Sequence, residues 1–213
     1  MKVKDFTKLW KQLLPQLPGF AIEKKLIFKS PVEDFLHGLY FESSADADRF
    51  YLSVFFLPLF VPRDSVSGTF GKRIGSGTNW RAGNPNLFAD LNTAIQNEAM
   101  PFLDNVFTLA GVLNYLKRTI ESGRPRVNSH VLEAYAYTLI KSGDYSSALE
   151  SLAELKQMLE GDSTPWVVAQ FNRAQLIEEK LLPKPDAALA QLEAWKVETI
   201  GKLGLEKHVG LAY

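Results

Sequence analysis

A run of twelve residues, FYLSVFFLPLFV at positions 50–61, contains a single polar side chain, that of Ser53. Aromatic and branched residues, which favour extended backbone, dominate the run. A strand with one face in water alternates apolar and polar residues. Here both alternating sets are apolar or aromatic: Phe50, Leu52, Val54 and Phe56 on one face, and Tyr51, Phe55 and Leu57 on the other. The run therefore predicts a central β-strand that is covered on both faces.

Three other segments have strand composition. Residues 20–30 alternate apolar and charged side chains, which predicts a strand with one face in water. Residues 35–42 predict a further strand, and residues 65–74 predict another that Gly68 and Gly71 weaken. The links between these segments are short, and parallel strands need a crossover of about a dozen residues or more. We therefore expect a small, mainly antiparallel sheet of about four strands.

Apolar residues follow a helical period at both ends of the chain. An N-terminal amphipathic helix is expected to end at Pro15, and its lysines leave a membrane-surface helix as the alternative. A helix that starts near Leu87 should kink or split at Pro101. A further helix should begin after Thr108, which can cap it. Four more helices are then predicted at about 129–142, 145–160, 164–180 and 185–201.

These elements predict an α+β fold. We expect residues 1–120 to form an α+β sheet domain, with the N-terminal helix on the sheet. Residues 121–213 should form an all-helical region of antiparallel hairpins. A chain of 213 residues buries about 70% of the surface that its unfolded form exposes, so it needs no metal or disulfide for stability.

Composition limits the classes of partner and site that this chain can have. Lys plus Arg and Asp plus Glu both number 24, so no net charge points to nucleic acid. The absence of cysteine removes disulfides, thiolate metal sites and a Cys nucleophile. The N-terminal 19 residues lack the continuous apolar core of a secretory signal, and no run approaches the ~20 apolar residues of a membrane-spanning helix. We expect a cytoplasmic protein that binds neither nucleic acid nor membrane; its oligomeric state stays open.

The segment 130–159 resembles a helical hairpin of the tetratricopeptide family. The residues that match the family pattern are Ala136 in the first helix, Gly143, Asp144 and Tyr145 at the turn, and Ala148 and Leu152 in the second helix. A second, weaker match contains Trp166 and Ala188 and is displaced by about forty residues. The resemblance implies a peptide-binding groove. The alternative is a helical cap that serves packing alone, because such stacks usually need about three repeats.

Known catalytic motifs are absent. The three histidines, His37, His130 and His208, do not form a metal-ligand or H-E-x-x-H pattern. His37 alternates with apolar residues, which favours a core histidine over a catalytic one. Residues 75–78 lack the lysine of a phosphate-binding loop, and no dinucleotide fingerprint or nucleophile elbow occurs. We therefore expect no metal and no cofactor.

The segment from Arg63 to Arg81 is the richest in binding chemistry. Arg63, Arg73, Trp80 and Arg81 lie in links with many glycines, and Trp and Arg are the residues that most often anchor protein interfaces. These four residues are the candidate binding site. In the alternative interpretation, Trp80 covers the sheet edge and the arginines are solvated.

The N-terminal half, with LHGLYFESS, RFYLSVFFLPLFVP and GTFGKRIG, resembles small bacterial α+β families of unknown function. Some related proteins are immunity proteins that bind and block a toxin, so the resemblance implies a binding role. Two hypotheses follow. The first is a non-catalytic protein-binding or adaptor protein, of which an immunity protein is one form. The second is an enzyme that uses His37 or the Arg63–Arg81 region.

Overall fold

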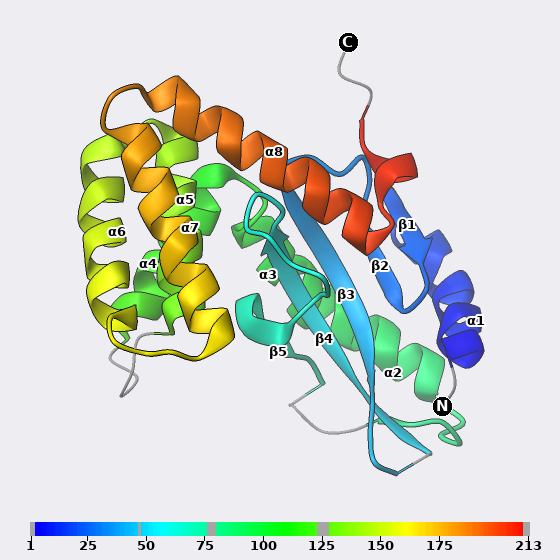
Figure 1. The fold of residues 1–213 in the computed structure, drawn as a ribbon. Helices are drawn as coiled ribbons and strands as arrows, with labels where there is room; N and C mark the ends of the chain where they lie inside the picture. The colour runs from blue at the N-terminus through cyan, green and yellow to red at the C-terminus, as the bar shows by residue number, and fades with distance from the viewer. Residues whose placement is uncertain (1–2, 47, 76–79, 123–127, 211–213) are drawn as a thin grey trace. The chain divides into compact units, whose positions relative to one another are not determined.

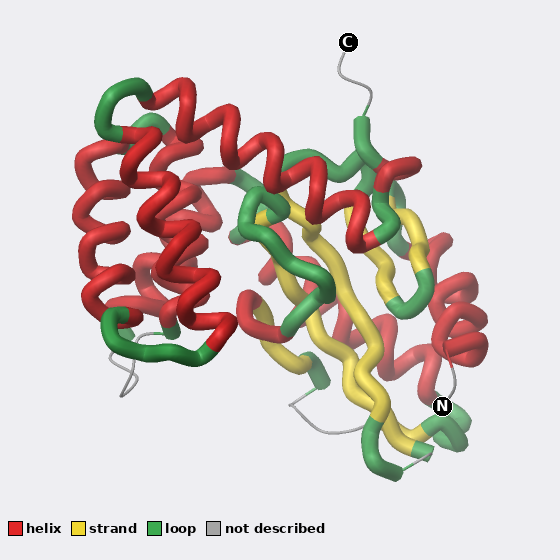
Figure 2. Tube along the Cα trace, in the orientation of Figure 1, coloured by secondary structure: helices red, strands yellow, loops and turns green. Residues whose placement is uncertain are grey.

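The fold is α+β: an antiparallel sheet with an N-terminal helix, followed by a helical C-terminal region, as the sequence predicts (Figures 1 and 2). The structure is a computed structural model and describes residues 3–46, 48–75, 80–122 and 128–210. The chain forms two compact units. The sheet unit comprises Met1–Leu57, Ser65–Phe107 and Leu203–Tyr213; the helical unit comprises Pro58–Asp64 and Thr108–Lys202. The domain boundary expected at residue 120 lies within helix α4.

The sheet has six described strands in the order β1-β2-β3-β4-β5, and β6 also pairs with β4. The strands are β1 (Phe20–Glu23), β2 (Leu26–Lys29), β3 (Phe35–Ser43), β4 (Arg49–Pro58), β5 (Gly71–Arg73) and β6 (Trp80–Arg81). Figure 1 shows β3 and β4 as the two long strands of the sheet. The side chains of Val54 and Phe56 on one face and of Phe55 and Leu57 on the other are 0% exposed, whereas Tyr51 near the start of β4 is partly exposed. The prediction of a central strand covered on both faces is confirmed from Leu52 onward, and at Tyr51 the cover is incomplete.

The strand expected over residues 20–30 is instead a hairpin. Phe20 pairs with Lys29 and Glu23 with Leu26, so the chain reverses at Lys24, whose φ is 54°. Lys24 interrupts the apolar alternation of the segment, and it occupies the left-handed conformation that such a tight turn needs. The sheet therefore has more than the four strands expected.

The strand expected over residues 65–74 shortens to β5. Gly68–Phe70 forms a 3₁₀ turn, and only the three residues of β5 pair with β4. Gly71 is required there, because an added Cβ would lie 2.1 Å from the carbonyl oxygen of Val54. The glycine link after β5 also contains a strand that the sequence did not predict, β6, which pairs with the start of β4.

One face of the sheet packs against helices. This face of β3 and β4 forms a core with α1 (Val3–Leu13), α2 (Leu87–Ala94), a π-helical turn (Ile95–Ala99) and α3 (Met100–Asn105). The Trp10 ring stacks 4.1 Å from Phe41, and its Nε1 donates a hydrogen bond to the Lys25 carbonyl. Where the sequence predicts a kink or split at Pro101, the helix continues but contains a π-helical turn that ends just before α3, and Pro101 lies in the first turn of α3.

The helical unit contains the hairpins that the sequence predicts. Its helices are α4 (Leu109–Glu121), α5 (Ser129–Ser142), α6 (Tyr145–Leu159), α7 (Pro165–Leu181) and α8 (Pro185–Leu203), and α6 packs against both α5 and α7 (Figure 1). Gly143 has a φ of 84° and ends α5, and the Asp144 carboxylate accepts a hydrogen bond from the Ser147 amide at the start of α6. The described 3₁₀ turns outside the helices are Leu14–Gln16, Gly68–Phe70 and Glu206–His208.

Burial of Val54 yields the first prediction. Val54→Asp should prevent folding, because an unpaired buried charge costs several kcal/mol and a domain is stable by about 5–15 kcal/mol. The control is Lys72→Asp, since Lys72 lies directly opposite Val54 on β5 but is exposed. Circular dichroism and thermal melting distinguish the two. A Val54→Asp protein that melts cooperatively like the control contradicts the assignment of β4 as the central strand.

Candidate functional site

The four candidate binding residues fall in different units. Arg73 lies on β5 and Trp80 and Arg81 lie on β6, and both strands pair with β4 in the sheet unit. Arg63 belongs to the helical unit. The structure therefore brings three of the four into one strand arrangement and places the fourth in a different group of side chains.

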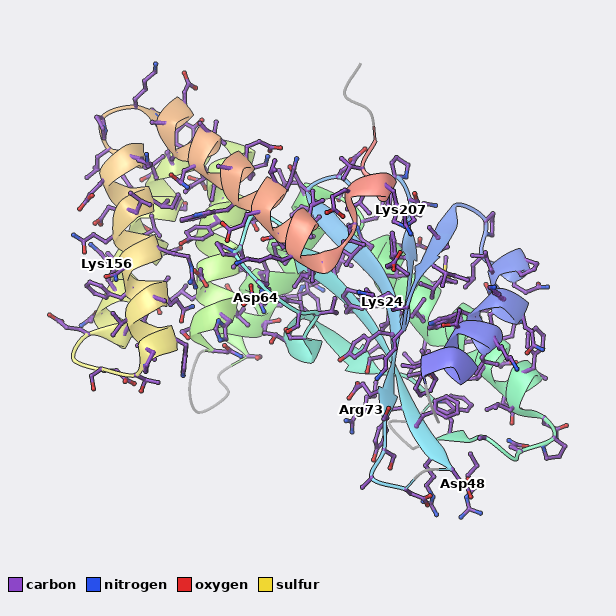
Figure 3. The ribbon with its side chains drawn as sticks, turned by 45° about the vertical axis from the view of Figure 1, so that its right-hand side comes forward. Lys24, Asp48, Asp64, Arg73, Lys156 and Lys207 are labelled. Carbon is purple, nitrogen blue, oxygen red and sulfur yellow. The ribbon has the colours of Figure 1, made fainter. Side chains whose placement is uncertain are left out.

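Arg73 is held by an aromatic ring and a carboxylate. Its guanidinium carbon lies 3.7 Å from the centroid of the Tyr51 ring, and Nη2 donates a 3.0 Å hydrogen bond to Glu42 Oε2. Ser53 Oγ donates to the other carboxylate oxygen at 2.5 Å. Burial alone would raise the pKa of Glu42, but the hydrogen bonds from Arg73 and Ser53 outweigh burial and lower that pKa. Figure 3 shows Arg73 beside the long β3–β4 hairpin.

Arg81 lies on the same face as Arg73. Arg81 is directly opposite Arg49 on β4, and alternate residues of a strand share a face, which places Arg49, Tyr51 and Ser53 together. Arg73 is directly opposite Ser53. Arg49, Tyr51, Arg73 and Arg81 therefore form one surface, which we name the arginine–tyrosine face. Arg49 forms an ion pair of 3.0 Å with Asp46, and both Arg73 and Arg81 are exposed.

Trp80 lies on the opposite face from Arg81. It pairs with Phe50 and packs, half-buried, against the core that α1–α3 form with the sheet. Gly75 lies under its ring with a φ of +76°, and a Cβ at that position would be 2.2 Å from the ring. This placement favours the interpretation in which Trp80 covers the sheet edge. The alternation of side chains in β6 is what separates Trp80 from Arg81.

Trp80 and Arg81 are adjacent, so substituting them separately tests this separation. Trp80→Ala should lower the free energy of unfolding by roughly 2–3 kcal/mol, somewhat less than for a fully buried Trp. Arg81→Ala should change it by no more than about 0.5 kcal/mol, as exposed positions do. Urea unfolding measures both. Equal and small effects would mean that Trp80 contributes little to the core and is free to contact a partner.

A buried ionic network joins α5 and α7 in the helical unit. Glu133 is 0% exposed and receives two hydrogen bonds from Arg173, 2.8 Å from Nε and 3.2 Å from Nη2. The Gln170 amide donates to Glu133 at 3.0 Å and accepts a hydrogen bond from Ser129. Burial lowers the pKa of Arg173, but the charge of Glu133, the hydrogen bond to Glu133 and the interaction with Tyr137 together outweigh burial and raise that pKa. The network can hold the two helices in register.

Arg63 lies near this network. Burial lowers the pKa of Arg63, and the charge of Glu133 opposes the change. Burial and then the charge of Arg63 lower the pKa of His130, whose ring lies 5.4 Å from that of Trp166. Trp166 is 54% exposed, so this aromatic pair reaches the surface. The residues that the sequence interpretation missed here are Glu133, Gln170 and Arg173.

The surroundings of His37 are those of a histidine in a protein core. Its side chain is buried, its Nε2–H donates a 2.8 Å hydrogen bond to the Val106 carbonyl, and its ring centroid lies 5.6–6.5 Å from those of Phe35, Phe56 and Phe107. Burial lowers the pKa of His37, and the bond to Val106 only partly opposes this. The ring is therefore neutral at pH 7. Such contacts serve packing, as the sequence analysis favours.

The lowered pKa of His37 makes stability depend on pH. The unfolded chain binds a proton at His37 near pH 6.5, whereas the folded chain binds it only at lower pH. The contribution of His37 to the free energy of unfolding is therefore fully present above pH 6.5. It is lost as the pH falls toward the pKa of His37 in the folded chain, by at most about 1.4 kcal/mol per pH unit for this one group.

The variant that tests this pH dependence is His37→Gln, because glutamine retains an N–H that can donate to Val106 but does not titrate. Urea unfolding at pH 7.5 and 5.5 should show a smaller loss of stability for His37→Gln than for the parent. His130 and the carboxyl groups are common to both proteins, so the difference reports His37. Identical losses contradict the assignment of His37 as a buried neutral group.

The described residues contain neither a cluster of metal ligands nor a membrane-spanning helix. In the ranges that the structure describes, no group of three or more His, Cys, Asp or Glu is placed to hold a metal ion. No helix in the same ranges is both long and apolar enough to cross a membrane. The cytoplasmic location stays a prediction from the sequence.

Comparison of the chain with models of protein families, with curated proteins and with solved structures gives no match. The resemblances to tetratricopeptide hairpins and to small bacterial immunity families therefore stay predictions.

Proposed function

We propose that this protein is a non-catalytic protein-binding or adaptor protein and that the arginine–tyrosine face is its contact surface. The observation that carries the proposal is the ordering of Arg73 over Tyr51 by Glu42, with exposed Arg81 on the same face. Arg and Tyr are enriched among the residues that dominate binding energy at interfaces. An immunity-type role, in which the bound protein is a toxin, is one form that this function can take.

The face suits a protein surface that presents hydrogen-bond acceptors. A guanidinium has only donors, and its planar fork matches a carboxylate with two parallel hydrogen bonds. Glu42 and Asp46 engage Arg73 and Arg49. Because Tyr51 and Glu42 already order Arg73, binding a partner loses less side-chain entropy there than at a mobile arginine. The expected partner surface therefore carries uncharged hydrogen-bond acceptors opposite Arg73, which Glu42 neutralises, and a carboxylate opposite Arg81.

Affinity capture tests this proposal. The tagged full-length parent and its Arg73→Ala/Arg81→Ala variant are used as bait in extracts of the source cells, with mass spectrometry of what binds. The control is Lys72→Ala/Lys117→Ala, which removes the same charge at exposed positions outside the face. A protein that the parent and control retain should be lost with the arginine variant. If each protein retained by the parent is retained equally by the arginine variant, the proposed face is wrong.

The enzyme hypothesis needs separate support. The His37 environment is made of phenylalanine rings and a backbone carbonyl, which is a surrounding suited to packing. Arg73 and Glu42 neutralise one another. These contacts favour the binding proposal over catalysis at either of the two places that the sequence suggested.

A further inference from the structure

The turn between α6 and α7 forms a pocket of about 250 Å³ in the helical unit. Leu159, Val168 and Phe171 supply its apolar part, and Glu160, Asp162 and Ser163 border it. Pockets that enclose small molecules have volumes of about 300–1,000 Å³. This smaller, open pocket suits one side chain of another protein better than a free metabolite. Figure 1 shows the turn joining the ends of α6 and α7.

The backbone of the turn is fixed by its residues. Glu160 has a φ of −59° and a ψ of 134°, Gly161 has a φ of +79°, and the Asp162 amide donates to the Leu159 carbonyl. These values describe a type II turn, which requires glycine at the position of positive φ. The Asp162 carboxylate accepts a 2.8 Å hydrogen bond from the Thr164 amide, just before α7 begins. The pocket is therefore built into the fold.

The border of the pocket is acidic. Glu160 and Asp162 are exposed, and hydrogen bonds from Thr164 lower the pKa of Asp162. Lys156 on α6 and Arg173 on α7 are both in ion pairs, with Glu178 and Glu133 respectively. Together, these observations give the pocket a negative border around an apolar floor.

We propose that this pocket binds a basic peptide segment of a partner protein, with one apolar side chain inserted between Leu159, Val168 and Phe171. Lysine or arginine residues next to that side chain contact Glu160 and Asp162. Val168 is 41% exposed, so the apolar surface that the inserted side chain covers is available in the free protein. The site lies in the helical unit and is independent of the arginine–tyrosine face.

Selection from a random peptide library tests the proposal. Dodecapeptides displayed on phage are selected on the immobilised full chain, and the affinity of the enriched synthetic peptides is measured by fluorescence polarisation. The enriched peptides should share an apolar residue with Lys or Arg within two positions. Their affinity should fall as salt increases, because the ionic contacts at the rim are exposed.

Three variants locate the bound peptide. Val168→Glu places a charge in the pocket and should weaken binding at least tenfold. Glu160→Lys reverses a border charge and should weaken binding and reduce its salt dependence. Leu176→Glu, at another exposed apolar position of α7, is the control and should change the affinity less than twofold. Circular dichroism checks that each variant is folded.

The proposal is overturned if the selection enriches no peptide or enriches acidic peptides. It is also overturned if Val168→Glu and Leu176→Glu bind the selected peptides equally.

Discussion

The burial of β4 on both faces is the constraint on which the sheet unit depends. A strand that exposes neither face needs hydrogen-bonding neighbours on both edges and apolar cover on both sides, and β3, β5 and β6 supply the edges. Only the start of β4 departs from this rule. The side chains of Arg49 and Tyr51, which share one face, are partly exposed, and the residues that follow them are buried. Polar chemistry is therefore confined to that end, which is where the arginine–tyrosine face lies.

Much of the fold could be predicted because its determinants are local. Gly143 and Asp144 end one helix and start the next, and Pro165 and Pro185 each open a helix, so the predicted helices agree with the observed ones to within about two residues. The hairpin at Lys24 and the two-residue strand β6 could not be predicted in this way. The first needs a left-handed lysine, and the second is defined only by its pairing with β4.

The candidate sites also divide into features that local sequence could predict and features that depend on the packing of distant elements. The sequence pointed to Arg73 and Arg81, but grouping them with Trp80 ignored that neighbouring residues of a strand point to opposite faces. Glu133 and Arg173 are 40 positions apart, which matches the displacement of about forty residues between the two hairpin patterns. That spacing could have suggested that they face one another across α5 and α7. It could not show which polar residues become buried, because that depends on how the helices pack.

Both proposed surfaces are already ordered in the free protein, and this limits the free energy that is lost on binding by ordering side chains and loops. Tyr51 and Glu42 order Arg73, while Gly161 and Asp162 fix the turn beside the pocket. Ordering a long side chain or a loop on binding costs about 0.5–1.5 kcal/mol for each mobile group, so small preformed surfaces can bind where flexible ones of equal area do not. The surfaces also differ in chemistry, one offering guanidinium groups and the other an acidic rim around an apolar floor. Two partners of opposite charge can then be distinguished by one chain, which is the property that an adaptor requires.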